Sequence, residues 1–310
     1  MRAISRLAGA TAYAAAACLF FFILQFPAGD FSGWLTGRVN AGGAFVASIK
    51  NASAGLFPPG VRLEEISLSS AGGAQILKAP QAFASLSLSS LAAGRPGFVL
   101  TIPAYGGELR LTLAAAPLFG GGQARLTLDI EDVDPAKLPA GLLPSGAGLQ
   151  GLLSGEASFA FETSGPPGAS GSANPANAPA APVPPVPPVT GKGELRLAGA
   201  SLAVPAALFA VERLDLGEVK AAFTVKGQEA AVSELVFKSP RASGKLSGTL
   251  RAAPDIPNSA LALAGEWKVD PADLKMTAIA DQAAIKALRQ RAPLSLRLSG
   301  TLAAPQCAWH

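Results

Sequence analysis

The chain has 310 residues, of which 49% are hydrophobic and only 15% are charged, and it contains 34 glycines and 26 prolines. This apolar content is enough to bury a substantial core, while the many turn-forming residues and the few charges favour short strands over long surface helices. The net charge is only +4, part of it from Arg2 and Arg6, so a strongly basic surface is excluded and no nucleic-acid partner is expected.

The first predicted element is a membrane anchor. After Arg2 and Arg6 the chain carries no charge until Asp30, and about 20 apolar residues is the length that crosses a bilayer as a helix. We therefore predict a cytoplasmic tail over residues 1–6 and a transmembrane helix over residues 7–27 that lies in the lipid bilayer. Because the arginines precede the span, the positive-inside tendency places the N-terminus in the cytoplasm and the main domain across an inner membrane.

A cleaved signal peptide is the alternative to this anchor. The stretch Gln25-Phe26-Pro27-Ala28-Gly29 lacks the Ala-x-Ala spacing that cleavage needs, so we favour the uncleaved anchor. Cys18 then lies in the membrane, and Cys307 is the only other cysteine, so no disulfide within the chain is expected. A large exported domain without disulfides is typical of the bacterial periplasm.

The remainder of the chain predicts a mainly β fold with a few short helices. Short segments such as Leu109-Arg110-Leu111-Thr112-Leu113 alternate apolar and polar residues with period two, which is typical of half-buried strands. We expect about a dozen antiparallel strands, in a first periplasmic half over residues 28–163 and a second over residues 191–310. Between the halves, residues 164–190 are rich in Pro and Ala and carry no charge, which predicts an unstructured or polyproline linker.

One of the predicted strands, over residues 61–68, changes its apolar phase at Glu64 and Glu65. A β-bulge at this point would keep the four apolar side chains of the segment on one face of the sheet. The four are Val61, Leu63, Ile66 and Leu68.

Three short sequences occur twice. Gly-Glu-Leu-Arg-Leu lies at 107–111 and 193–197, Val-Asp-Pro-Ala-x-Leu lies at 133–138 and 269–274, and Leu-Ser-Gly-Thr-Leu lies at 246–250 and 298–302. In the second pair, Asp134 and Asp270 are natural helix N-caps, and each is followed by a proline that suits the first helical position. We expect a strand that runs into a short helix at each copy, and the order of the repeats indicates duplicated strand–helix–strand units.

The chemistry available to the chain predicts no enzyme. The only histidine is His310, so a catalytic triad would have to be assembled from a chain end, and Cys18, Cys307 and His310 do not make a zinc site. The carboxylates of residues 129–134 lack the glycine and distal glutamate of a calcium loop. Alternation places Asp129, Glu131 and Val133 on one face and Ile130, Asp132 and Asp134 on the other, which we interpret as the solvated end of a strand.

Nucleotide-binding motifs are not supported either. Residues 146–151 match G-x-G-x-x-G, but the segment that follows predicts a strand where a dinucleotide fold needs a helix. Gly191-Lys192 and Gly244-Lys245 are followed by Gly193 and Leu246 instead of the Ser or Thr of a phosphate-binding loop. We therefore expect no catalytic, cofactor-binding or metal-binding residues and no cofactor.

The apolar alternation leaves two architectures open. One is a sandwich whose two apolar faces meet, and the other is an open, curled sheet whose concave apolar face holds acyl chains or docks a partner strand. The scarcity of charges to mark a solvated face favours the sandwich.

The order of these features resembles the type II secretion system protein N (GspN) family. The likeness is carried by the N-terminal anchor and by residues 56–68 (LFPPGVRLEEISL), 106–109 (GGEL), 149–157 and 298–305 (LSGTLAAP), and the linker has no counterpart in it. Related β repeats occur in AsmA-like envelope proteins, which are implicated in moving lipid between membranes.

The resemblance implies a non-enzymatic, bitopic inner-membrane protein with a periplasmic β domain, an accessory component of the type II secretion apparatus of a Gram-negative cell. Its partners would be other secretion-system envelope proteins, and the family offers no catalytic residues to carry over. The alternative is an AsmA-like periplasmic protein that binds or transports lipid through its acyl chains.

Overall fold

The computed structural model describes residues 28–41, 43, 45–55, 60–70, 72–87, 90, 97–115, 123–139, 148–162, 189–204, 210–253, 258–273, 293–302 and 304–309. The predicted anchor over residues 7–27 lies outside these ranges, as does the linker up to residue 188. Within the described ranges, no helix has the length and apolar character needed to cross a membrane.

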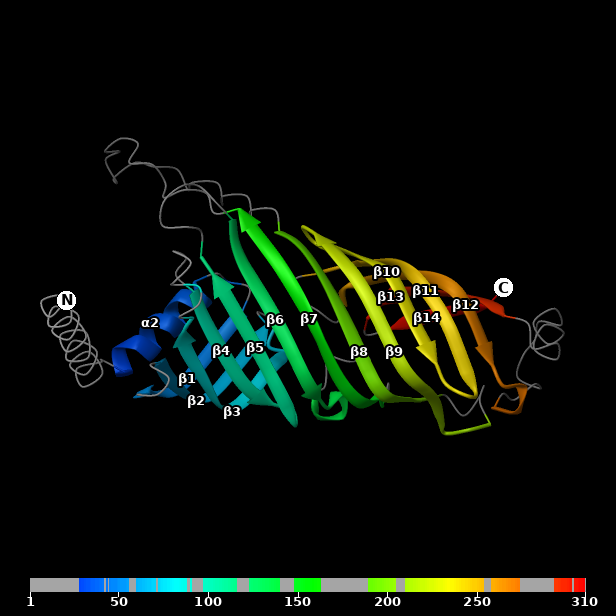
Figure 1. Ribbon diagram of the computed structural model, residues 1–310, viewed down its shortest axis with the longest axis horizontal. Helices are drawn as coiled ribbons and strands as arrows, with labels where there is room; N and C mark the ends of the chain where they lie inside the picture. The colour runs from blue at the N-terminus through cyan, green and yellow to red at the C-terminus, as the bar shows by residue number, and fades with distance from the viewer. Residues whose placement is uncertain are drawn as a thin grey trace, which may run out of the picture.

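The described strands form one antiparallel sheet in which every strand pairs with its neighbours in the sequence (Figure 1). Fourteen strands are described, running without a crossover from one edge of the sheet to the other. They are β1 (Phe45–Gly55), β2 (Gly60–Ser70), β3 (Gln75–Leu86), β4 (Gly97–Ala104), β5 (Gly107–Ala114), β6 (Gln123–Val133), β7 (Gln150–Glu162), β8 (Val189–Ala203), β9 (Arg213–Lys226), β10 (Glu229–Lys238), β11 (Ala242–Arg251), β12 (Ala260–Val269), β13 (Leu294–Thr301) and β14 (Pro305–Trp309).

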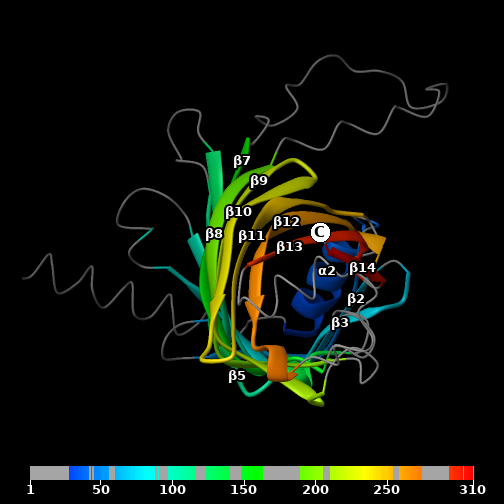
Figure 2. The same ribbon diagram turned by 90° about the vertical axis from the view of Figure 1, so that its right-hand side faces the viewer.

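The mainly β, antiparallel fold predicted from the period-two alternation is confirmed, but the sandwich is wrong. No described strand leaves the sheet to begin a second one, because each hairpin adds the next strand to the same edge. Viewed along the long axis of the molecule, the sheet curls around itself (Figure 2). The apolar face is thus sheltered by the curl of a single twisted sheet, so of the two predicted architectures the open, curled sheet is correct.

The helix α2 (Ala28–Asn40) lies inside this curl and packs against the edge strand β1 (Figure 2). This helix was not predicted from the sequence, although Leu35 and Val39 are spaced four residues apart and so share one face of a helix. The Asn40 side chain accepts a hydrogen bond from the Ala47 backbone N–H at 2.6 Å and donates one to the Ala47 carbonyl at 3.3 Å. Asn40 thereby occupies backbone groups that an edge strand would otherwise leave unpaired.

The two predicted halves belong to one continuous sheet, because β7 and β8 pair along most of their length. β7 ends at Glu162 and β8 begins at Val189, so residues 189–190, assigned to the linker in the sequence analysis, belong to a strand.

Of the predictions made from the repeated sequences, the short helices are confirmed and the duplicated unit is not. Both Val-Asp-Pro-Ala copies end a strand and begin a short 3-10 helix, η1 (Pro135–Lys137) after β6 and η3 (Pro271–Asp273) after β12, as predicted. In each copy the N-cap aspartate accepts a hydrogen bond from the alanine N–H two residues on, at 3.0 Å. The Gly-Glu-Leu-Arg-Leu copies lie on β5 and β8, and the Leu-Ser-Gly-Thr-Leu copies begin on β11 and β13. These spacings of six, three and two strands do not fit one duplicated unit.

Candidate functional site: an apolar groove

The face of the sheet that is turned toward α2, here called the inner face, carries an apolar groove in the first half of the chain. Strand pairing aligns its side chains in rows across β4, β5 and β6, such as Ile102, Leu109 and Ile130. The cavity has a volume of about 530 Å³, within the range of sites that hold small molecules. It is lined by Leu35, Val39, Phe45, Ala47, Ile49, Leu63, Ile66, Ser67, Leu68, Ile76, Leu77, Leu100, Ile102, Tyr105, Leu109, Leu111, Leu128, Ile130, Val133, Leu138 and Leu153.

Among the described residues the lining is almost entirely hydrocarbon, since only Ser67 and Tyr105 of them have a polar side chain. The cluster at its base is built largely from small residues, because Ala79, Ala82 and Ala104 are buried there beside larger aliphatic side chains. Small side chains in these positions leave space above the sheet. The groove can therefore accommodate a ligand that brings apolar surface and few hydrogen-bonding groups.

In β2, residues three apart in the sequence point to the same face of the sheet and line the groove. The predicted β-bulge at Glu64 and Glu65 is not found, because β2 pairs with β1 and β3 without a shift of register at this level. Glu65 instead has a φ of 50°, an uncommon backbone conformation for a residue with a side chain. Leu63, Ile66 and Leu68 all line the groove, so the predicted common face is correct for these three residues although the bulge is wrong.

A true bulge lies in β6, where the register with β7 shifts between Ile130 and Val133. Asp132 has a φ of 51°, and its carboxylate accepts a hydrogen bond from the Ser154 hydroxyl at 3.2 Å. Val133 consequently joins Ile130 in the groove lining. The alternation of the sequence predicts these two residues on opposite faces, which is wrong because simple alternation does not allow for an inserted residue.

Tyr105 ties one end of the groove to the neighbouring strand. It occupies the turn between β4 and β5 with a φ of 56°, and its hydroxyl accepts a hydrogen bond from the Lys78 N–H at 2.9 Å and donates one to the Ile76 carbonyl at 3.3 Å. Its own carbonyl accepts a hydrogen bond from the Asp134 N–H at 3.0 Å, which places η1 against the same turn. Leu138, just after η1, is part of the groove lining.

The inner face of the second half is filled by larger side chains. Phe237 and Trp267 are buried there with their ring centroids 6.4 Å apart and their planes at 73°, an edge-to-face contact. Around them lie Leu214, Ala242, Leu246, Val269, Leu294 and Leu296, all buried. This part of the inner face is a packed core.

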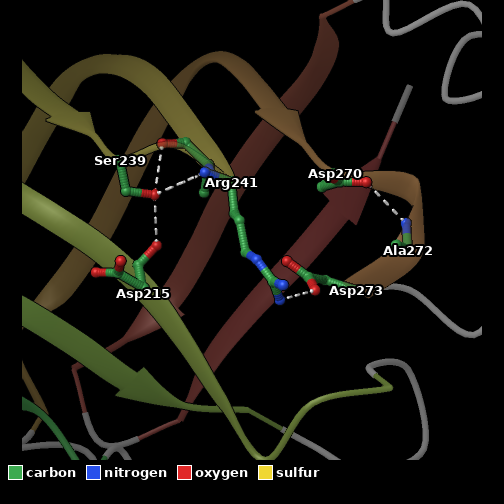
Figure 3. Close-up of polar contacts among 7 residues, drawn as sticks. Asp215, Ser239, Arg241, Asp270, Ala272 and Asp273 are labelled. Carbon is green, nitrogen blue, oxygen red and sulfur yellow. Dashed lines mark hydrogen bonds and ion pairs between the residues drawn. The ribbon is translucent and has the colours of Figure 1, made fainter.

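Polar contacts fix the turn at the end of this packed core (Figure 3). Arg241, in the turn between β10 and β11, reaches the carboxylate of Asp273 on η3 at 2.8 Å, and the Asp273 side chain is only 3% exposed. The Ser239 hydroxyl donates a hydrogen bond to the Asp215 carbonyl at 2.8 Å and accepts one from the Ala242 N–H at 2.9 Å. These bonds join β9, the turn and η3.

The opposite, outer face carries charged side chains such as Arg110 and Asp129, which pair in register. The predicted carboxylate cluster of residues 129–134 does not converge there: Asp129 pairs in register with Arg110 and Glu156, Glu131 with Glu108, and Asp132 bonds to Ser154. Within the described ranges, no group of three or more histidine, cysteine, aspartate or glutamate side chains has the arrangement of a metal site.

The other residues weighed in the sequence analysis have ordinary surroundings or lie outside the described ranges. Lys192 lies on β8, and Lys245 on β11 forms an ion pair with Glu234 at 2.8 Å. The G-x-G-x-x-G segment leads into β7, as the sequence predicted. Cys18, His310 and the side chain of Cys307 are not among the described parts of the chain.

Two ion pairs on the surface perturb pKa values. The hydrogen bond from Lys220, aided by the charge of Arg196, holds the pKa of Glu218 below its ordinary value. The hydrogen bond to the carboxylate of Glu65 raises the pKa of Lys50 above its ordinary value. Neither group lines the groove, so both shifts concern surface ion pairs and not ligand binding.

Comparison of the chain with family models, with curated proteins and with solved structures gave no match in any of the three.

Proposed function

We propose that the protein is a non-enzymatic, lipid-binding protein of the cell envelope and that its groove holds the acyl chains of a lipid. The observation that carries the proposal is the lining of the groove, whose described residues are all apolar except Ser67 and Tyr105. An acyl chain brings no hydrogen-bonding groups into such a site, whereas a peptide or a sugar would bury polar groups without partners.

The backbone of the groove strands is also unsuited to a peptide. β3, β4 and β5 each pair on both sides, so their ladder donors and acceptors are already used. A peptide strand laid across this face would lose its own hydrogen bonds with water and gain none in return. These considerations favour a lipid over a partner strand as the occupant of the groove.

The proposed location is the periplasmic side of an inner membrane, with a single anchor over residues 7–27 and a cytoplasmic N-terminus. This part of the proposal depends on the sequence pattern alone. A domain held at a bilayer by such an anchor would be close to a source of lipid.

Lipid binding is tested on the full-length chain purified in detergent, with bound lipid identified by mass spectrometry. A Leu111→Glu variant places a charge in the groove and should reduce bound lipid by about tenfold or more, because the carboxylate disfavours an apolar occupant. Thr112→Glu is the matched control, since Thr112 is the next residue on β5 and faces the other way. Absence of lipid from the wild type, or equal lipid in both variants, would refute the proposal.

A second candidate function is that of an accessory subunit of a type II secretion apparatus. It is supported by the resemblance to the GspN family and by the edge strand β14, which pairs only with β13 among the described strands. An open strand edge is a surface on which a partner can add a strand. Deletion of the gene should lower export of type II substrates, and unchanged export would exclude this role.

A further inference from the structure

Three exposed apolar side chains lie side by side on the inner face, on β3, β4 and β5. Leu86 pairs in register with Phe98, and Phe98 pairs with Leu113. Their exposed fractions are 47%, 51% and 41%. Neighbouring apolar residues that remain exposed form a contiguous patch, which is typical of a contact site and not of a scattered surface residue.

This row continues directly into the groove. The next inner-face positions along the same strands are Ala84, Leu100 and Leu111, which pair with one another, and the two leucines line the groove. Because residues two apart on a strand are separated by about 7 Å, the exposed row is one step from the cavity wall. An apolar chain would thus remain in contact with hydrocarbon along its whole path from the row to the cavity.

The other end of the same strands is occupied by protein. Tyr105 follows β4 and hydrogen-bonds to the backbone of β3, while Asp134 bonds to the Tyr105 carbonyl and brings η1 against the turn. Leu138 adds an apolar side chain at this end. The two ends of the groove therefore differ in the described residues: Tyr105 and Leu138 line one end, and the exposed apolar row lies at the other.

We propose that Leu86, Phe98 and Leu113 form the mouth of the groove, through which an acyl chain passes from a bilayer surface into the cavity. This inference depends on the proposed lipid-binding function and adds a direction to it. Residues at a mouth contact the chain in transit, so they control how fast lipid enters and leaves. Residues of the cavity wall, such as Leu111, control how much lipid is held.

The experiment compares the rate of lipid uptake with the final amount of lipid bound. Full-length protein in nanodiscs is mixed with vesicles of phosphatidylglycerol and phosphatidylethanolamine that contain a self-quenched fluorescent phospholipid, and uptake is followed by the recovery of fluorescence. The variant Leu86→Ser/Phe98→Ser/Leu113→Ser should slow uptake by about tenfold or more, because polar side chains interrupt the apolar path. Its final lipid content should match that of the wild type.

The control is the variant Val46→Ser/Leu152→Ser. These residues are exposed to a similar extent, 53% and 49%, but lie on the opposite face of their strands from Ala47 and Leu153 of the groove lining. The control should take up lipid at the wild-type rate. Unfolding midpoints measured for all variants check that they are folded, and Phe98→Ser alone replaces the triple variant if the latter unfolds.

The outcomes separate the inference from the function on which it depends. If the wild type takes up no lipid, the proposed function is wrong and the mouth is wrong with it. If the wild type takes up lipid and the triple variant does so at the control rate, the groove stands and the mouth is refuted. If the triple variant loses final lipid content as much as rate, these residues hold the ligand and are not a mouth.

Discussion

The first and second halves of the sheet use the same inner face in different ways. In the first half, aliphatic side chains and buried alanines leave a groove, whereas in the second half Phe237 and Trp267 fill the corresponding space. Both halves follow the same alternation of apolar and polar residues. The difference teaches that alternation decides which face is apolar, while side-chain volume decides whether that face is open or packed.

The two copies of the Val-Asp-Pro-Ala sequence also differ between the groove half and the packed half, although they share one backbone contact. In each, the N-cap aspartate donates its backbone N–H to the carbonyl of a turn residue, Tyr105 in the first half and Arg241 in the second. Tyr105 lines the groove, whereas Arg241 pairs with buried Asp273 of η3. The residue equivalent to Asp273 is Lys137, which pairs with the nearby Asp134 at 3.4 Å.

The largest effect on stability is expected from Trp267→Ala in the packed half. Removal of a buried aromatic side chain should lower the free energy of unfolding by about 3–5 kcal/mol, because the cavity is not refilled. Leu111→Ala in the groove should cost much less, since Leu111 already borders open space. Urea unfolding of both variants tests the contrast, and equal losses would show that the two halves are packed alike.

The second-largest loss of stability is expected from Gly244→Ala in the packed half. A Cβ at Gly244 would lie 2.6 Å from Cε1 of Phe237 and 2.8 Å from the Glu266 carbonyl oxygen, so the ring would have to move. Overpacking of this kind costs about 1–3 kcal/mol. The control is Gly37→Ala in α2, where a Cβ meets nothing within 4 Å and the helix should gain about 0.5–1 kcal/mol. Thermal unfolding that moved in the same direction for both variants would contradict this prediction.

Arg241→Ala should destabilise the turn of the packed half by about 1–2 kcal/mol, because it leaves the buried carboxylate of Asp273 without its ion-pair partner. Lys137→Ala, in the equivalent turn of the groove half, should change stability by less than about 1 kcal/mol, as is usual for exposed pairs. Chemical denaturation of the two variants measures the difference. A Lys137 effect as large as that of Arg241 would show that the two turns are equally dependent on charge.

The smallest expected effect concerns Glu218, at the outer surface where β8 and β9 meet. Its folded-state pKa is lowered by Lys220 and Arg196, so its ion pairs stabilise the fold above the ordinary glutamate pKa of about 4.3. That contribution is lost as the pH falls through the folded-state pKa. Glu218→Gln should therefore be slightly less stable than the wild type at pH 7 and equal to it in acid, and a difference that persisted at low pH would contradict the assignment.

Much of the local structure could be predicted from sequence. The alternation at residues 109–113 predicted the strand that the structure shows as β5, and Asp134 and Asp270 were predicted as N-caps and act as such. These features depend on residues close together in the chain, which act on the backbone directly. The helix α2 was missed because three of its 13 residues are glycines, which weaken the helical pattern.

The groove was only one of two alternatives in the sequence analysis. The phase of Val133 depends on a bulge that no local pattern around Asp132 announces, and the conformation of Glu65 replaces the bulge expected in β2. Both positions carry positive φ values on residues other than glycine, and such conformations persist because the surrounding strands hold them. Alternation could therefore not predict which face of the sheet the residues after Glu65 and Asp132 occupy.

The sequence by itself determined that this chain forms antiparallel strands with one apolar face. Period-two alternation places the apolar side chains of each strand on one face, and that face is stable in water only when it is sheltered. The tertiary structure alone decided that these strands form a single curled sheet, and that the apolar face is open beside Leu111 and filled beside Trp267. The physical reason is that a cavity depends on which rows of side chains the curl and register bring together. That information is distributed over strands far apart in the chain.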